Sequence, residues 1–203
     1  MPRISEARAG AEPSSPRQYA RRQSILRAAA DIAAETGLER VQMHEVAKSA
    51  GVAIGTLYRY FPSKTHLFTA VMADQIEGFG ARLPDRAAHS SSEDAVFATL
   101  VSATRNLLRR PALATAMIQS ANAARSTTVP DVERVDTGFL DLLLDAWGVK
   151  EPTEGQIARL RLLMLLWYGV LQTQLNERIT PKEADADLRL ACHLLLAPET
   201  DAG

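Results

Sequence analysis

Apolar residues recur every three to four positions along most of this chain, which is the spacing of an amphipathic helix. Glycine or proline residues separate these segments, and no run alternates apolar and polar residues as a strand would. The pattern predicts helices over about 17–35, 43–50, 54–60, 64–80, 93–109, 111–124, 131–147, 155–177 and 183–196. We therefore expect an all-α fold of about nine helices.

Two stretches differ in composition from the helical segments. Residues 1–16 are rich in Pro, Ser, Gly and Ala, which predicts a disordered tail. Residues 84–92, PDRAAHSSS, have the composition of a linker and mark a candidate domain boundary. We expect a small amino-terminal domain over 17–65, followed by a larger helical domain over 66–203.

Charge is unevenly distributed along the chain, although its net value is only −1. Residues 1–65 hold ten Lys/Arg and six Asp/Glu, which gives +4, and the remainder holds thirteen and eighteen, which gives −5. A basic head on an acidic body favours a polyanion as the partner of the head, although +4 is also an ordinary surface charge. The longest apolar run contains Arg161 and falls short of the roughly 18 residues of a membrane span, so we expect no membrane partner.

The segment MHEVAKSAGVAIGTLYRYFPSK, residues 43–64, has the pattern of two short helices around a glycine turn. Leu57 and Phe61 are four residues apart and should pack inward, which leaves Tyr58, Arg59 and Tyr60 on the remaining surface. A helix presented in this way fits the major groove of DNA. The predicted DNA-binding residues are Gln42, His44, Ala53, Thr56, Tyr58, Arg59, Tyr60 and Lys64.

Several of these assignments have a simpler alternative. Lys64 begins the fourth predicted helix, where the helix dipole disfavours a cation by about 0.3–1 kcal/mol. A phosphate there would meet the ammonium and the free backbone N–H groups together, whereas the alternative is a solvated lysine. Gln42 and His44 could equally be a polar cap residue and an exposed histidine. Likewise, the arginines at 17, 21 and 22 form either a minor-groove arm or a solvated face.

Residues 25–72 resemble the amino-terminal domain of the TetR family of bacterial transcriptional repressors. The resemblance is carried by GVAIGTLYRYFPSKTHLF, with its Gly-x-x-x-Gly-x-Leu-Tyr-x-x-Phe-x-x-Lys pattern. It implies a homodimer with helix-turn-helix DNA heads and a larger all-α ligand-binding and dimerisation body. Positions matching Thr56, Tyr58, Tyr60 and Lys64 commonly touch DNA in the family. One departure is that Gln42 follows Val41 where the family usually has threonine or serine.

A narrower resemblance concerns VQMHEVAKSAGVAIGTLYRYFPSKTHL, RRPALATAM and the final RLACHLLL. These segments are similar to actinobacterial repressors of steroid catabolism, which respond to coenzyme A thioesters of steroid breakdown products. The resemblance implies a mainly apolar effector, such as a steroid or fatty acyl-CoA thioester.

The body carries no metal-binding or catalytic pattern, so we expect neither an enzyme nor a bound cofactor. The histidines are scattered without a pair at i, i+4, and the single cysteine, Cys192, has the setting of a packed thiol. A set of large apolar residues with a few polar ones instead suggests a small-molecule pocket, although each could equally be ordinary core. The predicted pocket residues are Met117, Asn122, Phe139, Leu143, Trp147, Met164, Trp167, Tyr168 and Leu171.

The last two helices have wide apolar faces and are the predicted homodimer interface. The residues chosen for it are Leu160, Leu163, Leu166, Val170, Gln174, Leu188, Ala191 and Leu195. Together these features predict a cytoplasmic repressor that leaves a palindromic DNA operator when a small molecule binds. The alternatives are an activator or another DNA-binding regulator with the same head, a helical interaction module, and an enzyme.

Overall fold

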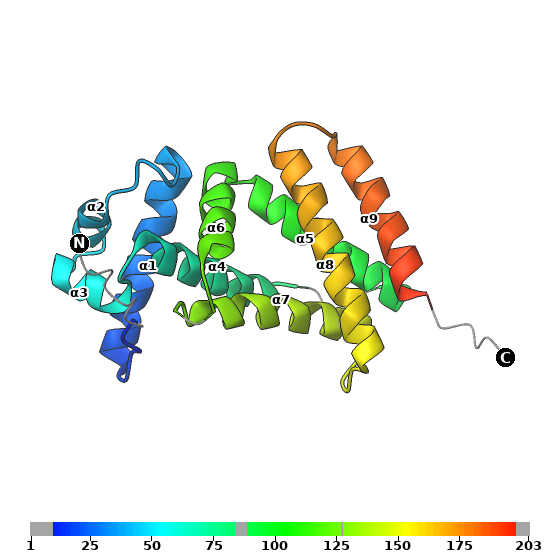
Figure 1. The fold of residues 1–203 in the computed structure, drawn as a ribbon, viewed down its shortest axis with the longest axis horizontal. Coiled ribbons are helices and arrows are strands. Elements are labelled where there is room, and N and C mark those ends of the chain that lie inside the picture. The colour runs from blue at the N-terminus through cyan, green and yellow to red at the C-terminus, as the bar shows by residue number, and fades with distance from the viewer. Residues whose placement is uncertain (1–9, 84–88, 127, 198–203) are drawn as a thin grey trace, which may run out of the picture. The chain divides into compact units, whose positions relative to one another are not determined.

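The computed structural model describes residues 10–83, 89–126 and 128–197. Over these ranges the chain forms nine α-helices and no strand, which confirms the predicted all-α class (Figure 1). The predicted helix ends agree with the observed ones to within two residues. The helices are α1 (Pro16–Thr36), α2 (Met43–Ser49), α3 (Ile54–Tyr60), α4 (Lys64–Gly80), α5 (Ser92–Leu108), α6 (Pro111–Ala123), α7 (Asp131–Trp147), α8 (Glu154–Leu175) and α9 (Pro181–Leu196).

Local chemistry explains where the helices begin and end. The hydroxyls of Ser91, Thr153 and Thr180 each accept a hydrogen bond from a backbone N–H three residues further on, which satisfies a donor that the first helical turn leaves free. Gly37 follows α1 with φ of 75°, and Gly51 follows α2 with φ of 67°. Residues with a Cβ rarely adopt such angles, so glycine allows the chain to turn sharply at both helix ends.

The described residues form two compact units. Unit 1 is drawn from Met1–Gly78 and Arg110–Gly138, and unit 2 from Phe79–Arg109 and Phe139–Gly203. Helices α4 and α7 therefore each supply residues to both units. Residues 1–9 of the predicted tail and 84–88 of the predicted linker lie outside the described residues, and the division of function at residue 65 stays a prediction. Residues 10–15, which the composition predicts to be disordered, are held in the structure by hydrogen bonds from Ala11 to Arg59 and from Ser14 to Gln18.

In unit 1, α1 packs against both α2 and α6, and α2 packs against α3. Its most buried large side chains are Ile25, Leu26, Leu57, Phe61, Leu67 and Phe68.

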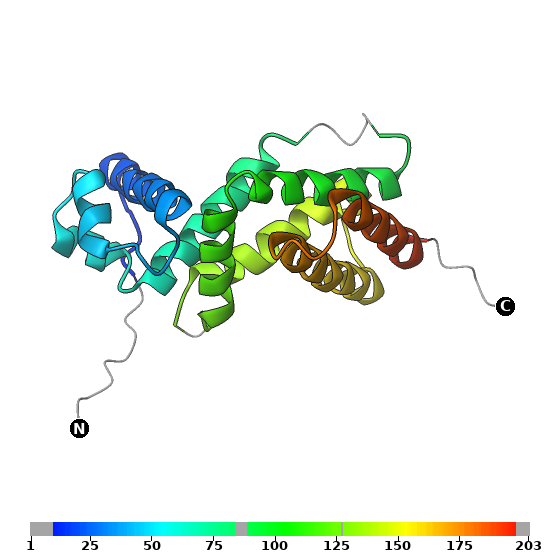
Figure 2. The same ribbon diagram turned by 90° about the horizontal axis from the view of Figure 1, so that it is seen from above.

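In unit 2, α8 and α9 form an antiparallel pair beside α5, and both views show α8 and α9 side by side (Figures 1 and 2). Its core includes Leu100, Leu143, Leu160, Leu163, Leu171 and Leu188. No helix in the described ranges is long and apolar enough to cross a bilayer.

Candidate nucleic-acid interface and ligand pocket

The α2–α3 pair is held at a fixed angle by a short turn. Val46 and Ala47 of α2 are buried, which attaches that helix to the core of unit 1. Beyond Gly51, the N–H of Val52 donates to the carbonyl of Ala47 at 3.0 Å and brings the chain back across the end of α2. Helix α3 then starts at Ile54, so the turn between the two helices is only a few residues long.

Helix α3 buries one face and exposes the other. Leu57 and Phe61 are completely or almost completely buried, which confirms the predicted inward packing. The side chains of Ile54 and Tyr58 are 42% and 48% exposed, high values for such large residues. Ala53, Gly55 and Arg59 are also exposed, and Thr56 is half-buried. The outer face of α3 therefore offers a small, partly apolar tip followed by an aromatic ring and a guanidinium.

Tyr60 does not lie on this outer face, and its predicted exposure is wrong. Its ring is only 4% exposed, and its buried hydroxyl has no hydrogen-bond partner within the described part of the chain. The physical reason is the helix period, because position 60 is three residues after the buried Leu57 and shares its face. The i, i+3 relation was available in the sequence and would have revealed this placement.

The Lys64 ammonium contacts backbone carbonyls of this chain. Neither interpretation from the sequence, a phosphate contact or a solvated lysine, included such a contact. Its ammonium lies 3.3 Å from the carbonyl oxygens of Leu38 and Glu39, in the loop between α1 and α2. The predicted cap of α4 is confirmed, since the Ser63 hydroxyl accepts from the His66 N–H. The His66 ring, in turn, contacts the Ser63 hydroxyl and the Thr128 carbonyl at 2.8 and 3.0 Å. The start of α4 is thus tied to two loops of unit 1.

Arg22 is an internal residue, so both predicted roles, a minor-groove arm and a solvated face, are wrong for it. Its guanidinium is 3.3 Å from the Asp131 carboxylate, and the two side chains are only 12% and 16% exposed. It also lies over the Phe61 ring at 5.4 Å. Asp131 pairs in addition with Arg134, which pairs with Glu77. Arg17, by contrast, is exposed and Arg21 half-buried.

Gln42 and His44 are exposed at the start of α2. Gln42 occupies the N-cap position, but its side chain forms no capping hydrogen bond. Both side chains are therefore on the surface. This placement is compatible with a DNA contact and also with an exposed residue that has no partner role.

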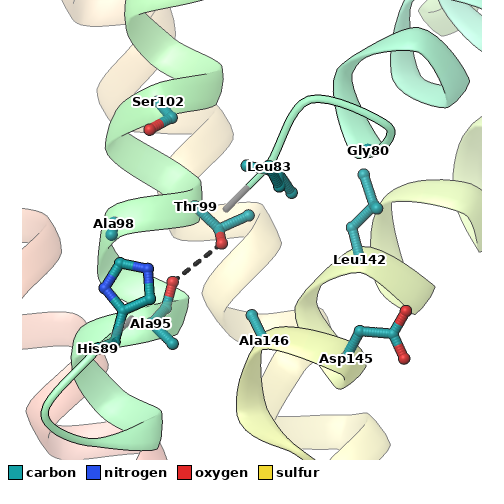
Figure 3. A pocket seen from close by; sticks show the side chains of 10 residues that line it. All are labelled: Gly80, Leu83, His89, Ala95, Ala98, Thr99, Ser102, Leu142, Asp145 and Ala146. Carbon is teal, nitrogen blue, oxygen red and sulfur yellow. Dashed lines mark hydrogen bonds between the residues drawn. The ribbon is translucent and has the colours of Figure 1, made fainter. Parts of the chain in front are cut away.

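Unit 2 contains a pocket of about 280 Å³ (Figure 3). Small residues and hydroxyls of α5 face α7 across it, and its polar groups include His89 and Asp145. The Thr99 hydroxyl is occupied by a 2.9 Å hydrogen bond to the Ala95 carbonyl. The lining residues are Gly80, Leu83, His89, Ala95, Ala98, Thr99, Ser102, Leu142, Asp145 and Ala146.

None of the nine predicted pocket residues lines this pocket. Phe139 and Trp167 stack on each other in the core of unit 2, with ring centroids 4.7 Å apart, and the indole N–H donates to the Thr104 hydroxyl at 2.8 Å. Leu143 and Leu171 are buried, and Met117 is buried in unit 1. Trp147, Met164 and Tyr168 are half-buried, and Asn122 is exposed. Of the three helices that carry the predicted pocket residues, only α7 borders this pocket, and it does so through Leu142, Asp145 and Ala146.

Cys192 is fully buried, as expected for a packed thiol. Burial, reinforced by the nearby Glu93 carboxylate, raises the pKa of its thiol to about 12. The thiolate that a nucleophile requires is therefore disfavoured. The described residues include no cluster of His, Cys, Asp or Glu that could hold a metal ion.

Two family models together match most of the chain. Residues 25–71 match the family model for bacterial regulatory proteins of the tetR family, and residues 90–195 match the tetracyclin repressor-like C-terminal domain. The HTH-type transcriptional repressor KstR of Rhodococcus jostii is 35% identical over 183 residues, covering 90% of this chain and 86% of its own.

Two solved structures extend the comparison. A TetR transcriptional regulator from Rhodococcus sp. RHA1 is 54% identical, with a TM-score of 0.85 over 91% of this chain and 100% of that one. The regulator FadR from Bacillus subtilis, solved in complex with stearoyl-CoA, has the same fold at 20% identity, with a TM-score of 0.58 over 86% of this chain and 97% of its own. The structure has the exposed second helix of a helix-turn-helix and an all-α body. Both features agree with the family that these matches indicate along most of the chain. This chain belongs to the TetR family of bacterial regulatory proteins and is a DNA-binding transcriptional repressor of the TetR type.

Proposed function

We propose that the chain acts in the cytoplasm as a homodimer that binds a palindromic operator through α3 of each copy and leaves it when a mainly apolar molecule enters unit 2. The observation that carries this proposal is the outer face of α3, which exposes Ile54 and Tyr58 while its inner face is anchored in the core. A rigidly held helix with a free face is what insertion into a major groove requires.

The chemistry of α3 suits both base and backbone contacts. Ala53 and Gly55 at its tip are small enough to let the backbone approach the base pairs, and Ile54 offers apolar surface to a thymine methyl group. Tyr58 and Arg59 carry the donors expected of phosphate contacts. Lys64 fits the same role because an ammonium has three donors, and the Leu38 and Glu39 carbonyls use two of them.

Selection of duplexes from a random library by the full-length chain tests the DNA-binding part. We expect enrichment of an inverted repeat whose half-sites are centred about 34–36 Å apart, one helical turn of DNA. Selection of a single half-site, or no enrichment at low salt, would contradict the proposed two-fold recognition.

Lys64→Ala tests the phosphate contact. It should weaken binding to the selected duplex and to a shuffled one alike, and should flatten the salt dependence of log K by about one unit. Arg178→Ala, which removes an exposed charge from unit 2, is the matched control and should change neither quantity. An unchanged salt slope with a lower melting temperature would mean that Lys64 serves only the loop between α1 and α2.

The homodimer is proposed to form through α8 and α9. Leu162, Leu165 and Leu166 of α8 and Leu190 and Leu194 of α9 are all at least 40% exposed, an unusual concentration of leucine on the surface of one helix pair. Of the eight interface residues predicted from the sequence, only Leu166 is exposed. Leu160, Leu163, Leu188 and Ala191 instead fill the core of unit 2. A second copy covering the leucines of both helices would remove this apolar surface from water.

The pocket between α5 and α7 is the proposed effector site. Its alanines and leucines suit an apolar skeleton, and His89, Ser102 and Asp145 offer a few polar contacts. Its volume of about 280 Å³ lies just below the range of about 300–1,000 Å³ for small-molecule sites. The Asp145 carboxylate would repel phosphate groups, so for a steroid or fatty acyl-CoA thioester we propose that the apolar part occupies the pocket.

Mass spectrometry of the molecule that co-purifies with the chain tests the effector site. Ala98→Phe would place a large ring in the pocket, so it should reduce the retained ligand strongly, while its operator affinity stays within about threefold of that of ligand-free wild type. Ala123→Phe, at an exposed position of unit 1, is the control and should retain ligand. Equal retention by both variants would place the ligand elsewhere.

A coupling of about 1–3 kcal/mol between the effector pocket and the DNA-binding surface would make the ligand lower operator affinity roughly 5–150-fold.

A further inference from the structure

The residues just before α1 lie against the end of the recognition helix. The N–H of Ala11 donates to the carbonyl of Arg59 at 2.9 Å. Gly10 lies so close that a Cβ added to it would be 2.0 Å from the carbonyl oxygen of Tyr60. No real Cβ tolerates such a contact with backbone, so the approach of the two segments depends on glycine at position 10.

Helix α3 needs this outside donor because of its own sequence. It has only seven residues, and the last four carbonyls of any helix have no partner within it. The Phe61 N–H satisfies the Leu57 carbonyl at 2.8 Å. The next residue, Pro62, has no N–H, so the chain cannot go on donating to the carbonyls at the end of α3. The hydrogen bond from Ala11 satisfies one of them.

The other end of this segment is fixed to α1. The Ser15 hydroxyl accepts from the Gln18 N–H at 3.3 Å and caps the helix. The Gln18 side chain accepts from the Ser14 N–H at 2.8 Å in return. Pro13 and Pro16 restrict the backbone between these contacts. Residues 10–15, which we call the brace, therefore form a short and stiff connection from the start of α1 to the end of α3.

We propose that the brace is a positioning element for operator recognition, one that holds the carboxyl-terminal end of α3 at the angle at which Tyr58 and Arg59 meet DNA. This inference rests on the proposed role of α3 as the helix that enters the groove. The brace acts on the backbone of the residues that carry these contacts, and Ala11 itself is exposed. It should therefore affect sequence-specific binding, which needs accurate placement, more than general attraction to phosphates.

The test uses the full-length chain and a duplex that wild-type protein selects from a random library. Ala11→Pro removes the N–H donor, and Ala11→Ser keeps it at the same exposed position. Gly10→Ala introduces the forbidden Cβ. We expect Ala11→Pro and Gly10→Ala to weaken binding to the selected duplex about 3–10-fold, in keeping with the loss of one hydrogen bond. Binding to a shuffled duplex should stay at the wild-type value, and the melting temperature should fall by no more than about 4 °C, as the loss of one hydrogen bond allows. Ala11→Ser should bind the selected duplex within twofold of wild type.

The outcomes separate this inference from the proposal on which it rests. If wild-type protein selects no sequence, recognition by α3 fails and the brace has nothing to position. If wild-type protein selects an operator but Ala11→Pro binds it as tightly as Ala11→Ser does, the brace alone is refuted. An equal loss on the shuffled duplex, or a melting temperature that falls by more than about 4 °C, would show a role in folding only and would also overturn the inference.

Discussion

The Trp167 side chain both packs in the core of unit 2 and donates a hydrogen bond there. Its ring stacks on Phe139 at an interplanar angle of 30°, and its N–H donates to the buried hydroxyl of Thr104 at 2.8 Å. The same hydroxyl donates to the carbonyl of Leu100 at 2.9 Å. A buried indole N–H without an acceptor costs free energy, so this contact explains why a threonine stands inside the core of unit 2.

Thr104→Val should lower the free energy of unfolding by about 1–3 kcal/mol, because it leaves the Trp167 N–H buried without a partner. In a Trp167→Phe background there is no such N–H, so the same change should cost clearly less. Urea unfolding of the four proteins in this double-mutant cycle measures the difference. An identical cost in both backgrounds would show that the hydrogen bond contributes nothing to stability.

At the scale of elements, the contact between α5 and α9 is reinforced at one end by a charge. Asp94, in the first turn of α5, accepts hydrogen bonds from the hydroxyls of Ser90 and Ser91 and from Arg189 of α9. The hydrogen bonds, from the two serines first and then from Arg189, lower the pKa of Asp94 to about 2. The Arg189 guanidinium also lies 3.6 Å from the centre of the Phe97 ring.

Asp94 should therefore make stability depend on pH. Its folded-state pKa lies below the ordinary value of 3.8, so its contribution is complete above that value and is lost as the pH falls through about 2. Asp94→Asn should lower the melting temperature between pH 5 and 7, and the gap to wild type should close as the pH approaches 2. Asp187→Asn, at an exposed position of α9, is the control and should show no such gap. A gap that is independent of pH would argue against the charge as its cause.

At the scale of the whole molecule, the proposed homodimer would connect the exposed leucines of α8 and α9 to DNA binding. An operator with two half-sites is bound tightly only by two linked heads, since each short helix contacts few base pairs. The leucines most exposed on each helix, Leu165 and Leu194, are 63% and 69% exposed. They contribute little to the fold of one copy and are therefore suitable positions for a test of the homodimer.

Leu165→Glu combined with Leu194→Glu should convert the chain to a monomer, because a dimer would bury four unpaired carboxylates. Helical content should be retained, and affinity for the palindromic duplex should fall by at least tenfold. Light scattering after size-exclusion chromatography and fluorescence anisotropy measure the two effects. Ala81→Glu, at an exposed position of unit 2, should leave both unchanged. A double variant that remains dimeric would place the interface elsewhere.

The sequence by itself determined the nine helices of the described ranges, their ends and the helix-turn-helix, because these depend on local period, on proline and on glycine at positive φ. The inward faces of Leu57 and Phe61 followed from the same period, and so would that of Tyr60. Only the tertiary structure decided which polar side chains are free. Arg22 finds its carboxylate partner 109 residues away, and Lys64 finds carbonyls in a loop 25 and 26 residues earlier. The pocket likewise depends on how α7 is rotated against α5, so Leu142 lines it and Leu143 does not. Partners and rotation come from packing between distant segments, which no local pattern of residues encodes.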